Sequence, residues 1–163
     1  MNSKKLQIQK EKLLKIKQAN RDHLMNYITK KFGSVCQVSV ISGWIISCCD
    51  DKEITNLEKL GISLGVLLKL SYDFTNLEED LLMADDKTNN FVINYGIQES
   101  FELFIDNKSK FIEGCIILDI YTNTVKEIVD LVETNVDKFV DDTIPDLKSQ
   151  YTLSLSKSNG NSN

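Results

Sequence analysis

Apolar residues recur at helical spacing along most of the chain, in segments that short polar stretches separate. The first segment, residues 3–31, predicts one helix. Gly33 and Ser34 then predict an interruption, with Ser34 as the N-cap of the next helix. Residues 35–49 are apolar nearly all round. Their β-branched content would suit a strand, but their length favours a buried helix.

Polar residues mark both ends of a third predicted helix. The acidic residues 50–53 indicate a turn, and Thr55 with Glu58 forms a capping-box pattern that opens a helix ending near Leu82. Residues 84–90 are polar and predict a loop before the next apolar segment.

Two further helical segments are predicted after this loop. In the first, which starts at Phe91, the apolar residues at helical spacing are Phe101, Phe104, Ile105, Phe111, Ile112 and Ile116. In the second, residues 123–140, the side chains predicted to face inward are Val125, Ile128, Val129, Val132, Val136 and Phe139. Pro145 ends the helical part, and the polar residues 146–163 predict a disordered tail.

Length and composition favour one all-α domain over residues 1–145, with about five or six helices. A chain of 163 residues suits a single domain, and its one proline and seven glycines favour helices over strand corners. No apolar run is long enough to span a membrane. The basic N-terminus lacks the apolar core of a secretory signal, so we expect a cytoplasmic protein.

Charge is unevenly distributed along the chain. Residues 1–31 contain nine Lys/Arg against two acidic residues, whereas the remainder contains ten lysines against twenty-two acidic residues. The basic start could bind nucleic acid or an anionic membrane surface, or guide anionic substrates toward the domain. Because it carries no recognised nucleic-acid motif, a solvated helical face is the favoured interpretation, with no nucleic-acid partner.

The residues that often carry chemistry give little support to catalysis. The four cysteines, Cys36, Cys48, Cys49 and Cys115, lack CxxC spacing and a histidine cluster, so we expect reduced, mostly buried thiols. The single histidine, His23, has no partner for nucleophilic catalysis and is expected at the surface.

The third predicted helix combines an apolar body with an acidic end. Its apolar residues are Leu60, Leu64, Leu67, Leu68 and Leu70. Gly61 and Gly65, four residues apart, predict the close approach of a neighbouring helix. Asp73, Asn76 and Asp80 share one helical face and could present oxygen ligands to Mg²⁺. The alternative is an amphipathic helix that ends in a solvated acidic patch.

Three segments carry a further signal through their order and spacing. They are KFGS at residues 31–34 with the apolar run after it, LGISLGVLLKLSYDFTNLEED at residues 60–80, and NFVINYG at residues 90–96 with its following helix. In this order they resemble the KTGSL segment, the LGxxLGxxFQxxDDxxD motif and the C-terminal layout of the trans-prenyltransferases, the polyprenyl (isoprenyl, geranylgeranyl-type) diphosphate synthases. The resemblance covers about residues 24–140 and implies part of an isoprenoid-synthase-like helical bundle.

The resemblance also implies roles for particular residues. Binding of the substrate diphosphate would fall to three lysines, Lys31, Lys69 and Lys87. The second aspartate-rich motif is degenerate, because its aspartate positions are occupied by Tyr72, Asp73 and Asn76. The resemblance therefore implies a weakened Mg²⁺ site formed by Asp73, Asn76 and Asp80.

Members of this family condense isopentenyl diphosphate head to tail with an allylic diphosphate in isoprenoid biosynthesis. The family's first aspartate-rich motif has no counterpart in this sequence. The resemblance therefore implies a truncated, split or degenerate prenyltransferase that is inactive alone, binds isoprenyl diphosphates, and forms a homo- or hetero-oligomer with a prenyl synthase chain. Two alternatives remain open, a non-catalytic regulatory subunit and an unrelated helical module whose basic first helix meets an anionic partner.

Overall fold

The computed structural model describes residues 18–47, 51–83 and 88–143, and over these ranges the chain is helical without strands. This confirms the predicted all-α class with about five or six helices. The elements are α2 (Arg21–Ile28), the π turn η1 (Thr29–Gly33), α3 (Ser34–Ile46), the 3₁₀ turn η2 (Asp51–Glu53), α4 (Ile54–Thr75), α5 (Leu77–Met83), α6 (Phe91–Ile117) and α7 (Asn123–Thr143). Within the described residues, no helix is both long and apolar enough to cross a membrane.

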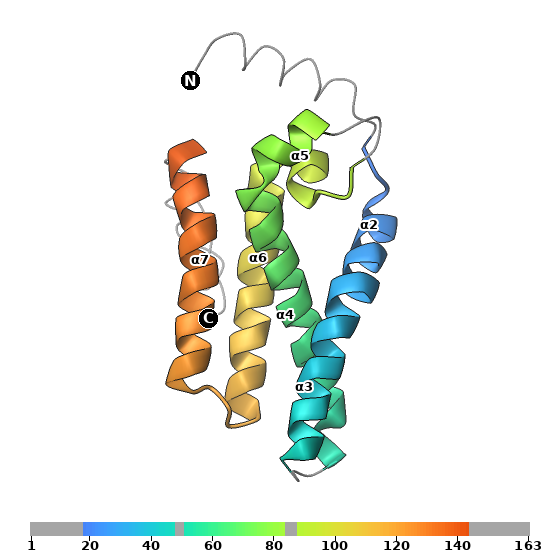
Figure 1. The fold of residues 1–163 in the computed structure, drawn as a ribbon, viewed down its shortest axis with the longest axis vertical. Coiled ribbons are helices and arrows are strands. Elements are labelled where there is room, and N and C mark those ends of the chain that lie inside the picture. The colour runs from blue at the N-terminus through green and yellow to red at the C-terminus, as the bar shows by residue number, and fades with distance from the viewer. Residues whose placement is uncertain (1–17, 48–50, 84–87, 144–163) are drawn as a thin grey trace, which may run out of the picture.

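Helix α4 is the centre of the bundle. It packs against α3 and η1 on one side and against α6 and α7 on the other (Figure 1). Two clusters of buried side chains lie along it. The larger cluster contains Leu24, Ile28, Val66, Leu67, Leu70, Phe74, Phe91, Val92, Phe101, Phe104, Val132, Val136 and Val140. The smaller cluster contains Leu57, Leu60, Phe111, Cys115, Leu118 and Val129.

The first described helix begins later than its sequence pattern predicts. Residues 18–20 are not helical, and α2 starts at Arg21 because the Asn20 side chain accepts a hydrogen bond from the His23 N–H at 3.2 Å. An N-cap asparagine satisfies an N–H that would otherwise lack a partner, which favours a helix start there. The prediction of one helix over residues 3–31 is therefore wrong at residues 18–20, and its first part lies outside the described residues.

The predicted interruption at Gly33 is also wrong. Gly33 has helical dihedral angles (φ −58°, ψ −48°), and the chain passes from α2 through the π turn directly into α3. Ser34 is not an N-cap, because its hydroxyl donates to the Lys30 carbonyl at 2.6 Å. The small residue has a packing role, since a Cβ at Gly65 of α4 would lie 2.5 Å from Gly33 N and 2.6 Å from Gly33 Cα.

Gly61 and Gly65 bring the backbone of α4 against the backbone of α3 and η1, as their spacing predicts. Gly61 faces the backbone of Gln37 just as Gly65 faces that of Gly33. At both positions a methyl group would meet backbone atoms, which cannot move aside as a side-chain tip can. The two glycines therefore set the separation of these helices.

The third predicted helix differs in its start and its continuity. It begins at Ile54 after the 3₁₀ turn, so the capping box of Thr55 and Glu58 does not form. It also breaks at Asn76, which separates α4 from α5. Within α6 a second departure occurs at Gly96, whose φ of 83° lies in the region that glycine adopts readily, so this helix is kinked.

Burial confirms most of the predicted inward positions and corrects a few. In α7, Val129, Val132 and Val136 are buried as predicted, but Ile128 is exposed. Leu68 of α4 and Ile116 of α6 are also exposed rather than buried. Their exposure follows from helix geometry, because each adjoins a buried residue and so points away from the core.

Two of the four cysteines can be described, and both are free thiols. Cys115 is buried, and burial raises the pKa of its thiol to about 11. Cys36 is half-buried. Cys48, Cys49 and the predicted tail at residues 146–163 lie outside the described residues.

Replacing Gly65 by alanine is expected to destabilise the protein by about 1–3 kcal/mol, because the added methyl group overpacks against the Gly33 backbone. Gly43 offers the matched control, since a Cβ there meets nothing within 4 Å and alanine favours the interior of α3 by about 1 kcal/mol. Urea unfolding of Gly65→Ala and Gly43→Ala should therefore give changes of opposite sign. Equal changes would contradict the packing role of Gly65.

Candidate functional site

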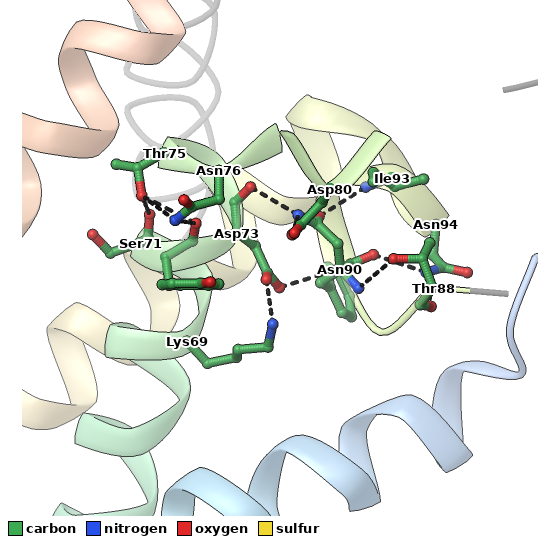
Figure 2. Close-up of polar contacts among 12 residues, drawn as sticks. Lys69, Ser71, Asp73, Thr75, Asn76, Asp80, Thr88, Asn90, Ile93 and Asn94 are labelled. Atoms are coloured by element: carbon green, nitrogen blue, oxygen red, sulfur yellow. Dashed lines mark hydrogen bonds and ion pairs between the residues drawn. The ribbon is translucent and has the colours of Figure 1, made fainter. Parts of the chain in front are cut away.

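The predicted site centres on Asp73, whose side chain is completely buried in the last turns of α4. One carboxylate oxygen pairs with the ammonium group of Lys69, one helical turn earlier. The other accepts a hydrogen bond of 2.9 Å from the Phe91 N–H, at the first turn of α6. Figure 2 shows this carboxylate between the two helices. Both oxygens of Asp73 therefore bind groups of the protein itself.

Asn90 extends this contact to α5. Its amide nitrogen donates to the Asp73 carbonyl at 3.0 Å and to the Asp80 carboxylate at 2.8 Å. Its side-chain oxygen accepts from the Ile93 N–H at 3.1 Å and so caps α6 (Figure 2). Sequence reasoning missed this residue, although an asparagine directly before an apolar helical run is an N-cap signal.

Asn94 continues the polar network toward the N-terminal part of the chain. Its amide nitrogen donates to the carbonyls of Thr88 and Asn90 at 2.9 and 2.8 Å. Its oxygen accepts from the Ala19 N–H at 2.8 Å, which ties the residues ahead of α2 to α6. Asn90 and Asn94 are both buried, and both have hydrogen-bond partners.

A second part of the site is a group of cations and aromatic rings on α2, η1 and α4. The ammonium group of Lys31 lies 5.3 Å from the Tyr27 ring centroid and 5.6 Å from the Phe32 ring centroid, and it donates to the Tyr27 hydroxyl at 2.9 Å. The ammonium group of Lys69 lies 5.4 Å from the centroids of both Phe32 and Tyr72. Two of the predicted diphosphate-binding lysines therefore meet at the Phe32 ring. We call these five residues the lysine–aromatic patch.

The environment of Asp73 raises the pKa of its carboxyl group above the ordinary value. Desolvation is the largest cause, and the nearby Asp80 charge adds to it, whereas Lys69 and the Phe91 N–H act in the opposite direction. An acid with a raised folded-state pKa favours the fold most below its unfolded pKa of about 3.9. That contribution is lost as the pH rises through the folded-state pKa.

The structure brings together four of the six predicted site residues, in two pairs. Lys31 and Lys69 meet at Phe32, and Asn90 connects Asp73 with Asp80. The Asn76 amide instead donates to the Tyr72 carbonyl and the Thr75 hydroxyl of α4, at 3.0 and 3.2 Å. Lys87 lies outside the described residues.

As arranged, the oxygen atoms around Asp73 do not suit Mg²⁺. A cation at the Asp73 carboxylate would have to displace the Lys69 ammonium group or the Phe91 N–H, and the Asp80 carboxylate already accepts from Asn90. The described residues contain no group of three or more His, Cys, Asp or Glu side chains placed to hold a metal ion. Binding of Mg²⁺ therefore stays a prediction, and the function proposed below does not depend on it.

Two cavities lie away from these residues. One, of about 520 Å³, is lined by α4 and α6, and the other, of about 660 Å³, is lined by Arg21, Tyr95, Gln98, Glu99 and Glu102. No predicted site residue lines either cavity.

Comparisons of the chain with protein-family models, curated proteins and solved structures found no match. The family assignment therefore stays a prediction that rests on the sequence segments.

Replacing Lys69 by methionine is expected to destabilise the protein by about 3–5 kcal/mol near neutral pH, because a buried carboxylate loses its counter-charge. Loss of Lys69 also raises the pKa of Asp73 further. The loss of stability should therefore become smaller as the pH falls, because the native variant binds a proton at Asp73. Urea unfolding at several pH values measures both effects.

The control is Lys110→Met, which breaks an exposed pair one turn apart between Lys110 and Asp106. Pairs in solvent contribute about 1 kcal/mol or less, so this variant should behave nearly as the wild-type protein does. A Lys69→Met deficit that is small, or that grows on acidification, would contradict the structural role of the buried pair.

Proposed function

We propose that this chain is a degenerate relative of the trans-prenyl diphosphate synthases, which binds an isoprenyl diphosphate and does not catalyse prenyl transfer on its own. The observation that supports it is the meeting of the three resembling segments in space. Phe32 of the first segment lies over Lys69 of the second, and Lys69 pairs with Asp73, which accepts from Phe91 of the third.

The lysine–aromatic patch matches an amphiphile with an anionic head. Lys31 is exposed and carries a charge that no carboxylate among the described residues neutralises through an ion pair. Leu68 and Tyr72 lie one turn apart on α4, with 40% and 56% of their surface exposed. Lys31 would bind the diphosphate, and these apolar surfaces would contact the isoprenyl chain.

The same geometry argues against catalysis by this chain alone. Departure of a diphosphate requires several positive charges to stabilise it. Lys69 already neutralises Asp73, so Lys31 is the main positive charge of the patch that remains for a ligand. One exposed lysine can contact a diphosphate, but it does not supply the several charges that drive its departure.

A second candidate function, as a non-catalytic subunit of a prenyl synthase, is favoured by the outer face of α3. This helix has no charged residue, and four of its apolar side chains are exposed, namely Val35, Val38, Ile45 and Ile46. Contiguous exposed apolar surface is typical of protein–protein contact sites.

Geranylgeranyl diphosphate is expected to bind the wild-type chain, and Lys31→Ala should weaken its binding about tenfold, because a charge-assisted contact is lost. Isothermal titration calorimetry measures the affinity of the wild-type chain and of Lys31→Ala. Lys30→Ala, at the preceding exposed residue, is the matched control. The uncharged alcohol geranylgeraniol should bind equally to all three proteins. Equal diphosphate affinity of wild type and Lys31→Ala, or prenyl transfer from labelled isopentenyl diphosphate by the chain alone, would contradict the proposal.

Replacing Val38 and Ile45 by aspartate should abolish association through α3, because charges would be buried at the contact. Sedimentation of the chain alone and mixed with a full-length prenyl synthase measures this association. Ile128→Asp on α7, another exposed apolar position, is the control and should leave association unchanged. A wild-type chain that stays monomeric and does not bind the synthase would contradict the subunit function.

A further inference from the structure

The cavity between α4 and α6 has the properties of a small-molecule site separate from the lysine–aromatic patch. Its volume of about 520 Å³ lies in the range of about 300–1,000 Å³ that is usual for ligand pockets. From α4 it is lined by Asn56, Lys59, Leu60, Ile62 and Ser63, and from α6 by Asn107, Lys110, Glu113, Gly114 and Ile117.

Opposite charges face this cavity from its two walls. The Leu60 side chain packs on Gly114, where a Cβ would lie 2.9 Å from the Leu60 terminal carbon. Lys59 and Glu113 are the neighbours of these two residues in sequence, so they lie at nearly the same level on facing helices. Both are described residues, yet no ion pair joins them.

Two buried neutral side chains of the cavity, Asn107 and Ser63, can accept hydrogen bonds from a ligand. The Asn107 amide nitrogen donates to the Leu103 carbonyl at 2.8 Å, and the Ser63 hydroxyl donates to the Lys59 carbonyl at 3.1 Å. Both side-chain oxygens can still accept a hydrogen bond from a ligand, and the Asn107 amide keeps a second N–H.

The second lysine of the cavity forms an exposed ion pair within its own helix. The Lys110 ammonium group pairs with Asp106 at 2.6 Å. Among the lining residues, Lys59 and Glu113 are therefore the charged side chains that form no ion pair with another described residue.

We infer that this cavity binds a small zwitterion with an apolar body, the chemistry of an apolar amino acid. Lys59 binds the ligand's carboxylate, and Glu113 with the oxygen of Asn107 accepts from its ammonium group. The apolar body lies over Leu60 and Ile117. A purely anionic ligand would be repelled by Glu113 and a purely cationic one by Lys59, so the charge arrangement selects a ligand that carries both charges.

Three probes with similar alkyl chains test this selection on the full chain: 2-aminooctanoic acid as the zwitterion, octanoate as the anion and octylamine as the cation. Calorimetric titration at neutral pH should show the zwitterion binding about tenfold more tightly than either singly charged probe. Octanoate or octylamine binding as tightly as the zwitterion, or no binding of any probe, would overturn the inference.

Charge-reversal variants of Lys59 and Glu113 test whether the ligand binds in this cavity. Lys59→Glu should weaken 2-aminooctanoic acid about tenfold and make octylamine the preferred probe, whereas Glu113→Lys should make octanoate the preferred probe. Both side chains are exposed, so the fold should tolerate either change. The matched controls Lys30→Glu and Glu127→Lys change exposed charges that do not line the cavity. Controls that shift the preference as strongly as the cavity variants would assign the effect to net charge and overturn the inference.

Discussion

Burial of the Asp73 carboxylate is the constraint on which the junction of α4, α5 and α6 depends. A carboxylate removed from water is costly unless its oxygens bind charged or polar groups. Lys69 on the same helix and the Phe91 N–H on α6 provide these partners, so the end of α4 must lie against the start of α6. Asn90 then connects this corner with α5. The Asp73 side chain thereby specifies how three helices meet.

The glycine contact and the ion pair are coupled through α4. Gly65 brings η1 into backbone contact with α4, and Lys69 stands one turn further along the same helix. Phe32, the neighbour of Gly33 in the π turn, is thereby placed over the Lys69 ammonium group. A bulkier residue at Gly65 would push η1 away and also take Phe32 from Lys69. The lysine–aromatic patch is therefore a consequence of close helix packing.

The sequence predicts the helices of this fold better than their junctions. The spacing of apolar residues predicts helices, and the spacing of Gly61 and Gly65 predicts a close helix contact. Both predictions depend on local helical geometry, and both are confirmed. The role of Asp73 depends on Phe91, a residue eighteen positions away that no periodicity connects to it. The continuous helix through Gly33 likewise depends on its contact with Gly65. Long-range contacts, which local patterns do not report, thus decided the role of Asp73 and the continuity of the chain at Gly33.

Lys31 of the patch adjoins the outer face of α3, which links the two candidate functions. Lys31 and Val35 are both exposed and lie about one helical turn apart, where η1 passes directly into α3. A partner that covers Val35 and Val38 would therefore reach over Lys31 and enclose a diphosphate held there. Enclosure lowers the local dielectric constant and strengthens the contact between ammonium and phosphate. Partner binding and diphosphate binding would then each increase the affinity for the other, since such coupling is reciprocal.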